Sequence, residues 1–346
     1  MKTKQHKTYF ALCLIFILQT FLFISCKDDP VTPVTPPAQD TINSYDWSIV
    51  DVGGILVDLY VADSTNIYLN TGTIPDYYNG YIVEPFDLQD PTFILNSING
   101  FDKNNIYFGG GNPSATKNPA LKKYSNGQIS TYTIQSDSTY YIGHILVEGA
   151  NKAWIGTQGG NHVYLFENSI FTEYNLNDTI LYPYFFKDSL GTLYLFAIKK
   201  EGADEYLAIY KHVGDVFEFV RKDLINYSAQ MYPLLYECGS ILVKTSDRDF
   251  NKLYYFNGFD WIYYMTTDFE ISKLGGYSRN KLIALDIYTN IWLYNDEHWV
   301  KEDSVNLNIY GYYYSYGGHV KIKENRIYFV IQYSNFNSKL IIGKPK

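Results

Sequence analysis

Cysteine is scarce in this sequence, with three residues among 346. Cys13 lies inside an apolar N-terminal run and Cys26 directly follows that run, so Cys238 is the single thiol expected in the folded part. One thiol excludes a disulfide within the folded part and a metal site built from several cysteines. Cys238 is therefore predicted to pack as a small apolar side chain in a strand.

Signatures of the common enzyme classes are missing too. The sequence has no G-x-S-x-G elbow, no H-E-x-x-H zinc motif and no P-loop. Gly109–Gly111 is not followed by a helical pattern, which favours a hairpin over a phosphate-binding loop. Asp188-Ser-Leu-Gly-Thr matches only part of a sialidase Asp box and is predicted to be a turn. These absences favour a non-catalytic protein without a metal or another cofactor.

Basic residues are outnumbered by acidic ones. Residues 1–25 contain three of the 28 Lys and Arg and none of the 36 Asp and Glu, so the rest carries 25 basic against 36 acidic residues, a net charge of −11. This balance disfavours nucleic acid and anionic membranes as partners. Helical periodicity is absent, whereas tyrosine (36) and phenylalanine (21) abound. Aromatic residues favour half-buried sheet surfaces, although an AT-rich coding sequence would also raise the tyrosine count.

Residues 1–25 are predicted to be a secretory signal peptide. Three lysines precede an apolar run from Phe10 to Ile24, the order of charge and hydrophobicity that such leaders have. Phe23-Ile-Ser-Cys26 resembles a bacterial lipobox, with Phe23 in place of the usual leucine. The resemblance implies cleavage before Cys26 and its acylation, palmitate included. An uncleaved membrane anchor is the alternative, because the run is only slightly shorter than a membrane-spanning helix.

Residues 26–44 are predicted to be a lipid-anchored, proline-rich tether. Lys27-Asp-Asp29 resembles the surface-export signal of outer-membrane lipoproteins from glycan-foraging Gram-negative bacteria, which implies an outer-membrane location facing the cell exterior. The stretch Asp28–Asp40 has no hydrophobic periodicity, so an extended, semi-rigid conformation is expected. Residues 45–346 are predicted to form one globular domain.

A four-strand unit recurs, roughly every 40 residues, across residues 45–346. Its clearest copy is Asn151–Leu176, where polar, Gly-rich and Glu-Asn turns separate short strands. Four short strands joined by hairpin turns form one blade, and a ring of blades protects its sheet edges. The sequence therefore predicts an all-β, seven-bladed β-propeller, or six blades if one repeat is irregular. The strand after each polar turn starts at Asn66, Asn105, Lys152, Thr192, Ser240, Lys281 and Arg326.

The last copy of the repeat lacks a fourth strand, because only four residues follow Lys339–Ile342. Near the start of the domain, Tyr45-Asp-Trp47 matches the beginning of a fourth strand such as Phe259-Asp-Trp261. Residues 47–52 are therefore predicted to complete the seventh blade and close the ring.

Two stretches resemble the propeller repeats of sensor domains from hybrid two-component regulators. Trp154-Ile-Gly-Thr157 with Gly159-Gly160, and the turn Asp188–Tyr194, match the family pattern D-x-x-G-x-[LI]-W-[IVL]-G-T in part. The third copy fits best, and no kinase or DNA-binding segment is present. The resemblance implies the propeller fold and a ligand-sensing heritage, without the signalling role. Trp154 is predicted to pack between blades.

Aromatic residues recur in the loops that lead into the innermost strands of the predicted blades. In a propeller these loops surround one mouth of the central channel. Tyrosine presents a flat apolar face and a hydroxyl, which suits sugars and peptides. Packing between blades is the alternative role for each tyrosine. The predicted ligand-binding residues are Tyr140, Tyr141, His144, Tyr184, Tyr232, Tyr277, Tyr312, Tyr314, Tyr316 and His319.

Three functions remain open. The favoured hypothesis is a cell-surface lipoprotein, held in the membrane through the lipid on Cys26, that binds a glycan or another extracellular ligand at the aromatic mouth. The second is a protein-interaction scaffold that binds an envelope protein in an outer-membrane complex. The third is a divergent hydrolase or lyase in which Asp58 or His144 would act.

Overall fold

A computed structural model describes residues 45–54, 56, 58–72, 74–112, 118–135, 141–225, 235–246, 251–295, 297–302, 320–332 and 338–346. The chain separates into two units, Met1–Asn43 and Ser44–Lys346, and every described residue belongs to the second. These residues form strands and turns and no helix. Within these ranges no helix is long and apolar enough to cross a membrane.

The first two sheets of the second unit are four-stranded antiparallel meanders. In each of them the strands follow one another in sequence order, as hairpin connections require. One sheet consists of β2 (Asp58–Asp63), β3 (Asn66–Asn70), β4 (Asp76–Tyr78) and β5 (Val83–Pro85), and the other of β6 (Ile94–Asp102), β7 (Asn105–Asn112), β8 (Asn118–Ser125) and β9 (Gln128–Thr133).

The third sheet has seven strands because one long strand belongs to two meanders. Residues 170–175 of β13 pair with β12, and residues 180–187 of the same strand pair with β14. The chain turns between the two parts, where Asn177 has a positive φ of 58°. The strands are β10 (Tyr141–Gly149), β11 (Lys152–Gln158), β12 (Gly160–Glu167), β13 (Ile170–Lys187), β14 (Leu193–Glu201), β15 (Asp204–Val213) and β16 (Val216–Ile225).

The fourth sheet joins two meanders through one parallel pair, Cys238 with Gly276. Cys238 is fully buried in this sheet, as predicted for a small apolar side chain. The strands of the first meander are β17 (Leu235–Cys238), β18 (Ile241–Thr245), β19 (Lys252–Phe256) and β20 (Trp261–Thr266). Those of the second are β21 (Ile271–Ser278), β22 (Lys281–Asp286), β23 (Ile291–Asn295) and β24 (Trp299–Glu302).

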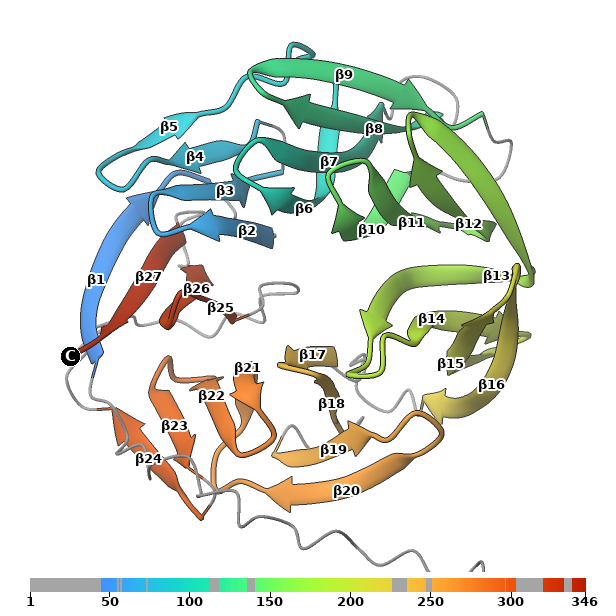
Figure 1. The fold of residues 1–346 in the computed structure, drawn as a ribbon. Helices are drawn as coiled ribbons and strands as arrows, with labels where there is room; N and C mark the ends of the chain where they lie inside the picture. Colours follow the sequence, from blue (N-terminus) through green and yellow to red (C-terminus); the bar gives the residue numbers. More distant parts are fainter. Residues whose placement is uncertain are drawn as a thin grey trace, which may run out of the picture. The chain divides into compact units, whose positions relative to one another are not determined.

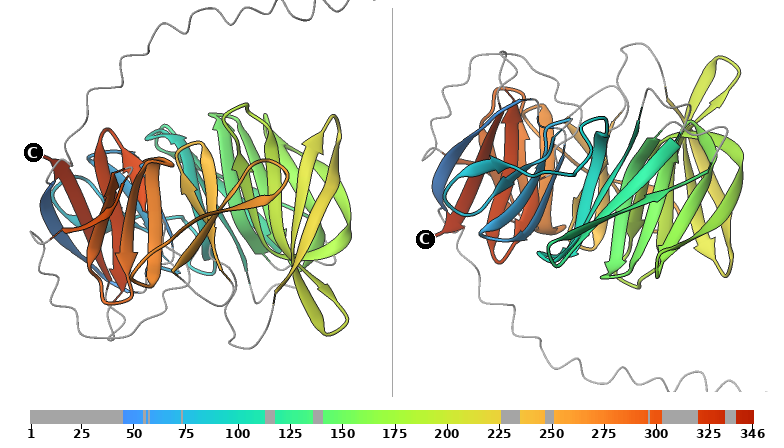
Figure 2. Two further views of the ribbon diagram at one scale, coloured as in Figure 1. Left: turned by 90° about the horizontal axis from the view of Figure 1, so that it is seen from below. Right: turned by 90° about the horizontal axis from the view of Figure 1, so that it is seen from above.

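When β13 is counted in two meanders and the fourth sheet is divided at its parallel pair, the described strands form seven four-stranded units. We number these units blades 1 to 7 from β2 onward. Blade 7 consists of β25 (Lys321–Lys323), β26 (Arg326–Gln332), β27 (Ser338–Pro345) and β1 (Tyr45–Val52). Figure 1 shows these sheets arranged as a ring with the first strand of each meander toward the centre, and Figure 2 shows the ring from two sides. The predicted all-β propeller is confirmed, and this grouping supports the predicted count of seven blades.

The N-terminal strand closes the ring, as predicted. All eight residues of β1 pair antiparallel with β27. Trp47 lies opposite Gly343 and packs edge-on against Phe329 of β26, with ring centroids 5.9 Å apart. A Cβ at Gly343 would meet the Trp47 ring at 2.5 Å, so the strand needs glycine there. The first and last strands of the domain therefore share one blade.

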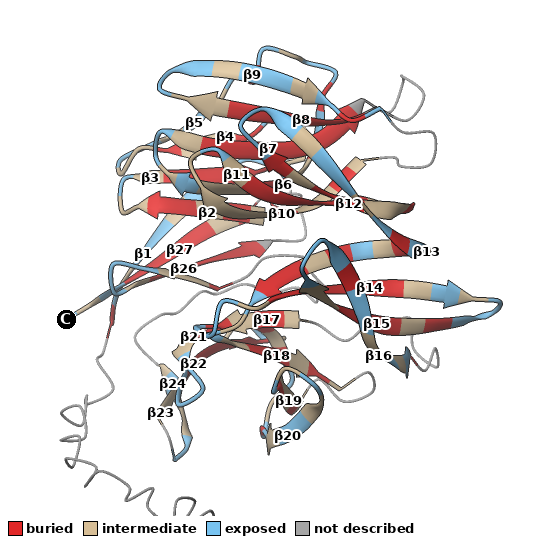
Figure 3. Cartoon of the chain, turned by 45° about the vertical axis from the view of Figure 1, so that its right-hand side comes forward, coloured by how far each residue is buried: buried red, intermediate tan, exposed pale blue. Residues whose placement is uncertain are grey.

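Apolar side chains pack between adjacent blades and form the core. Figure 3 shows that buried residues concentrate in the inner strands of the blades, whereas outer strands such as β9 and β20 contain no buried residue. Trp154 is 3% exposed and packs in a cluster with Phe185, Tyr210 and Phe217 of blade 4. The predicted position of Trp154 between blades is confirmed.

Tyrosine hydroxyls also fasten neighbouring blades. The Tyr68 hydroxyl of blade 1 donates to the Lys103 carbonyl at 3.2 Å, and the Tyr107 hydroxyl of blade 2 donates to the Ala150 carbonyl at 2.7 Å. Both acceptors lie in the turn that connects the first two strands of the following blade. These bonds satisfy buried polar groups at the blade junctions. They give part of the large tyrosine content a structural role.

We expect deletion of residues 45–52 to destabilise the domain strongly, because it removes a strand from blade 7 and exposes apolar side chains of β27. The melting temperature measured by circular dichroism should fall by about 10 °C or more. Ile49→Ser changes a 43% exposed side chain on the same strand and should melt within about 2 °C of the wild type. An unchanged melt of the deletion variant would show that the ring does not depend on β1.

Candidate functional site

Six of the ten predicted ligand-binding residues, and the predicted lipidation site Cys26, lie outside the described residues. The other four fall in two places, and the structure therefore locates only part of the predicted aromatic mouth. The six residues are Tyr140, Tyr232, Tyr312, Tyr314, Tyr316 and His319.

Tyr141, His144 and Tyr184 lie on the first strands of adjacent blades. Tyr141 begins β10, His144 follows on the same strand, and Tyr184 belongs to the blade 4 part of β13. The His144 and Tyr184 rings are 4.5 Å apart between centroids. His144 Nδ1 also accepts a hydrogen bond from the Phe185 backbone N–H at 3.1 Å. The structure thus brings two predicted residues into contact, inside strands rather than in the loops before them.

Tyr277 does not lie in a loop that leads into a blade, so this part of the prediction is wrong. It is the next-to-last residue of β21, beside the turn into β22, and its hydroxyl is hydrogen-bonded to Tyr45 of β1. Gly275 and Gly276 before it have the composition of a turn but lie inside the strand. Glycine is required at 275, because a Cβ there would meet Val320 at 2.6 Å. Tyr277 joins blade 6 to the closing strand.

Five polar residues lie on the first strands of blades 1, 3, 4, 5 and 7, the strands nearest the centre of the ring (Figure 1). The charges of Glu237 and Asp58 act on Tyr184, and the charge of Lys321 acts on Asp58 and His144. Side chains from separate sides of a ring interact in this way across its centre. All five residues are half-buried. We call Asp58, His144, Tyr184, Glu237 and Lys321 the axial cluster.

Burial sets the protonation of the axial cluster. Burial lowers the pKa of His144 to about 3, and the Lys321 charge adds to this effect, so the imidazole is neutral at pH 7. Burial raises the pKa of Asp58, while Lys321 and two backbone N–H groups oppose that rise. Burial also raises the pKa of the Tyr184 hydroxyl well above its ordinary value, so it remains a hydrogen-bond donor.

Two members of the axial cluster also fasten adjacent blades. Asp58 of blade 1 accepts a hydrogen bond from the Ile98 backbone N–H of blade 2 at 3.4 Å. Asn99 Nδ2 of blade 2 donates to the Ile145 carbonyl of blade 3 at 2.8 Å, and His144 of blade 3 bonds to blade 4. Four consecutive first strands are therefore linked near the centre. Asp58 and His144 thus have a structural role.

A polar residue recurs at one position of the first strands, which no motif in the sequence indicated. Pairing is irregular just before Ser97 in β6, His144 in β10 and Lys273 in β21. Each lies five residues before the end of its strand, as Asp58 does in β2. Such bulges re-aim side chains. Lys273 is 3% exposed, and burial lowers its pKa to about 8. If the repeats are aligned on the polar turn that follows each first strand, these polar residues fall at one shared position.

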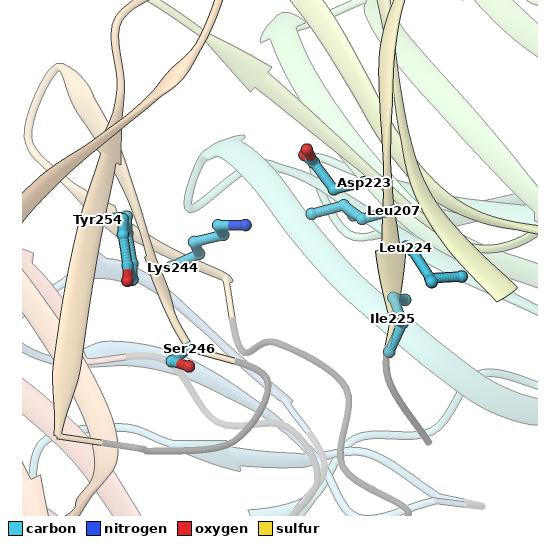
Figure 4. Close-up of a pocket in the computed structure, with 7 residues that line it drawn as sticks. All are labelled: Leu207, Asp223, Leu224, Ile225, Lys244, Ser246 and Tyr254. Atoms are coloured by element: carbon cyan, nitrogen blue, oxygen red, sulfur yellow. The ribbon is translucent and has the colours of Figure 1, made fainter. Parts of the chain in front are cut away.

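A cavity of about 180 Å³ lies between blades 4 and 5. Figure 4 shows Asp223 of β16 and Lys244 of β18 pointing toward one another across it. The Lys244 ammonium lies 4.7 Å from the Trp261 ring centroid, and Arg221 forms ion pairs with Asp223 and Asp260. These charged groups already have partners, which makes the cavity a polar junction between blades. Its lining residues are Leu207, Asp223, Leu224, Ile225, Lys244, Ser246 and Tyr254.

No group of three or more His, Cys, Asp or Glu side chains within the described ranges could hold a metal ion. The axial cluster mixes two carboxylates with a lysine, a neutral imidazole and a phenol. Divalent cations prefer several carboxylate, thiolate or imidazole ligands without a competing ammonium group. The chemistry that this cluster supports is therefore hydrogen bonding to a polar ligand.

The solved structures that this chain resembles are β-propellers. The structure of YCF48 bound to D1 peptide matches with a TM-score of 0.58 and 14% identity, over 88% of this chain and 100% of that one. YCF48 from Cyanidioschyzon merolae matches with a TM-score of 0.58 and 13% identity, over 86% and 98%. The WD40 propeller domain of Doa1 matches with a TM-score of 0.55 and 10% identity, over 86% and 97%. Identities this low show the fold alone.

Sequence comparisons add no relative. No protein-family model matches the chain, and no curated protein matches it. The fold therefore rests on the strand pairing and on the solved propellers, and function has to be argued from the arrangement of side chains.

We expect His144 to make stability depend on pH. The unfolded imidazole binds a proton near pH 6.5, whereas the folded one stays neutral down to about pH 3. Between these values the unfolded state binds more protons, so stability falls as the pH is lowered. From pH 7.5 to 5.0 the wild type should lose about 1 to 2 kcal/mol more unfolding free energy than His144→Gln, measured by urea denaturation. Equal losses in both proteins would contradict the neutral imidazole.

Proposed function

We propose that the protein is a non-catalytic binding propeller that holds a neutral glycan at the axial cluster. The axial cluster is the observation that carries this proposal. Lys321 opposes the charge of Asp58 within the cluster, and Glu237 adds a second carboxylate. His144 and Tyr184 add neutral hydrogen-bonding groups. A balanced set of donors and acceptors matches the hydroxyl groups of an uncharged sugar.

Hydrogen-bond capacity remains on the axial cluster after its structural contacts are counted. His144 uses Nδ1 to accept the Phe185 N–H, so a neutral imidazole carries its proton on Nε2. Among the described residues Nε2 has no hydrogen-bond partner, and the side chain is partly exposed. His144 therefore offers a donor in a fixed orientation to a ligand at the centre of the ring.

Aromatic side chains beside the cluster supply surfaces for the apolar faces of sugar rings. Tyr141 begins β10, next to His144, and is half-buried. Tyr182 is 55% exposed and adopts a positive φ of 50°, a backbone conformation that is uncommon outside glycine. Burial raises the pKa of Tyr141, and the nearby Tyr182 adds to this rise. Strained residues with exposed side chains often mark binding sites, and this pair supports a ligand that extends from the axial cluster.

The cellular location belongs to the same proposal. We propose that signal-peptide cleavage exposes Cys26, that acylation anchors the chain in the outer membrane, and that residues 26–44 hold the propeller outside the cell. The lipobox resemblance of Phe23–Cys26 and the following Lys27-Asp-Asp29 support this placement. One acyl chain binds a membrane only marginally, so stable anchoring needs more than one chain on Cys26.

A protein-interaction scaffold is the second candidate function. Two of the solved propellers with TM-scores of 0.58 belong to assemblies, YCF48 bound to D1 peptide and a mitotic checkpoint complex. The D1 peptide and the checkpoint complex are partners of those proteins and not of this chain. They support the second candidate because the same fold presents a rigid face with many loops, which serves protein partners as well as sugars.

We expect Tyr184→Phe to weaken glycan binding, because it removes one hydroxyl from the axial cluster and keeps the ring. A screen of neutral oligosaccharides against the purified chain should identify a ligand, and the variant should bind it about tenfold more weakly by calorimetry. Tyr81→Phe, which changes a 90% exposed tyrosine outside the cluster, should bind like the wild type. Equal binding by Tyr184→Phe would remove the proposed site. A stoichiometric envelope protein recovered with a chain that binds no glycan would favour the scaffold.

We expect Cys26→Ala to abolish lipid attachment. In Gram-negative cells supplied with labelled palmitate, the wild-type chain should incorporate the label and the variant should not, because the thiol is the predicted acylation site. Cys238→Ala serves as the matched control, since that thiol is buried in the propeller and should not affect labelling. Equal labelling of Cys26→Ala and the wild type would overturn the proposed anchor.

A further inference from the structure

A second cleft lies between blades 3 and 4, away from the axial cluster. Its volume is about 510 Å³, within the size range of pockets that bind small molecules. Glu148 and Lys187 line it from the last residues of the first strands of these blades, whereas Tyr141 begins β10 at the other end. The cleft therefore opens at the end of these strands opposite to Tyr141. Nothing in the proposed glycan site uses it.

The base of this cleft is aromatic and well packed. Trp154 and His212 both line it, with ring centroids 4.8 Å apart, and Phe217 packs against both rings. His212 Nε2 is buried without a hydrogen-bond partner in the described structure, a state that costs free energy. Burial lowers the pKa of His212, and the charges of Asp215 and Glu148 oppose this shift. Trp154 is 3% exposed, so the base is fixed before any ligand arrives.

Lysines outnumber acidic residues in the lining of the cleft. Lys152, Lys187 and Lys211 line it, with Glu148 as its one acidic lining residue. Glu148 contacts the Lys187 ammonium at 2.5 Å and the Lys152 ammonium at 3.9 Å. Lys152 also contacts Glu167 at 3.3 Å. Lys211 forms no ion pair among the described residues, and Glu218 lies opposite it in the pairing of β15 with β16. The Lys211 ammonium is therefore the lining cation with which a ligand anion can pair.

One wall of the cleft is a short, rigid turn. Asp188 Oδ1 accepts hydrogen bonds from the backbone N–H groups of Leu190 at 2.9 Å and Thr192 at 2.8 Å, which confirms the turn predicted there. The turn presents Leu190, whose side chain is 89% exposed, and Val213 at the end of β15 is 40% exposed. An isolated apolar side chain this exposed gains free energy when a ligand covers it. The cleft thus combines cations with an apolar rim.

We propose that this cleft binds a small organic carboxylate, with Lys211 as the main cationic partner and the rim at Leu190 and Val213 covering its carbon skeleton. The chain carries a net charge of −8, whereas lysines outnumber acidic residues in the lining of this pocket. Glu148 already neutralises part of the charge of Lys187 and Lys152. One ligand carboxylate bound to Lys211 would give each of the three lining lysines an acidic partner.

Glucuronate and glucose provide a matched pair of probes, because they share a sugar ring and differ in one carboxylate. In calorimetric titrations of the full chain at low ionic strength, we expect glucuronate to bind and glucose to bind this cleft at least about tenfold more weakly. Lys211→Gln should weaken glucuronate binding about tenfold, and added salt should weaken it in the wild type. Lys301→Gln, at an exposed position on β24, should bind like the wild type.

Three results would overturn the proposal: equal affinity for both sugars, unchanged glucuronate binding by Lys211→Gln, or no binding of glucuronate. Melting curves of both lysine variants show whether the fold is intact. Tyr184→Phe separates the two sites, since it should leave glucuronate binding unchanged while it weakens a neutral glycan at the axial cluster. A failure at the cleft therefore leaves the glycan proposal standing, and the reverse also holds.

Discussion

The pairing of β1 with β27 is the constraint on which the rest of the structure depends. It joins residues from the two ends of the domain, such as Ser48 and Ile342, which are 294 positions apart in sequence. Contacts of such high sequence separation form late and at a large entropic cost. Only a closed ring fixes where the first strands of all blades lie. The axial cluster, which combines side chains from five blades, exists because the ring is closed.

Blade junctions stabilise the ring by two repeated means. Apolar side chains such as Trp154 and Phe185 fill the space between sheets, and polar groups bond across it. Tyr68 and Tyr107 occupy the same place in successive blades and donate to the same turn of the next blade. A buried hydroxyl needs such an acceptor, because leaving it unpaired costs about 1 to 3 kcal/mol. The tyrosine content is thus partly a consequence of the fold, whatever the composition of the coding sequence.

Local patterns in the sequence predicted the fold well, and the site less so. The recurrent polar turns predicted the second strand of each blade. The match between Tyr45-Asp-Trp47 and Phe259-Asp-Trp261 predicted the strand that closes the ring. Glu237 and Lys321 were missed because neither lies in a motif. Their significance comes from convergence at the ring centre, which no local pattern encodes. Tyr277 was misplaced because Gly275 and Gly276 look like a turn, although close packing by Val320 requires glycine within the strand.

The two proposed sites are connected through the junction of blades 3 and 4. His144 of the axial cluster accepts the Phe185 N–H, and the Phe185 ring lies 6.1 Å from Trp154, which forms the base of the lysine-lined cleft. Coupling between sites requires an element with two arrangements, and contact alone does not supply one. Phe185 is fully buried, and densely packed side chains of this kind hold one arrangement. The packing therefore favours two independent sites, one neutral and one cationic, held at fixed positions by the same rigid junction.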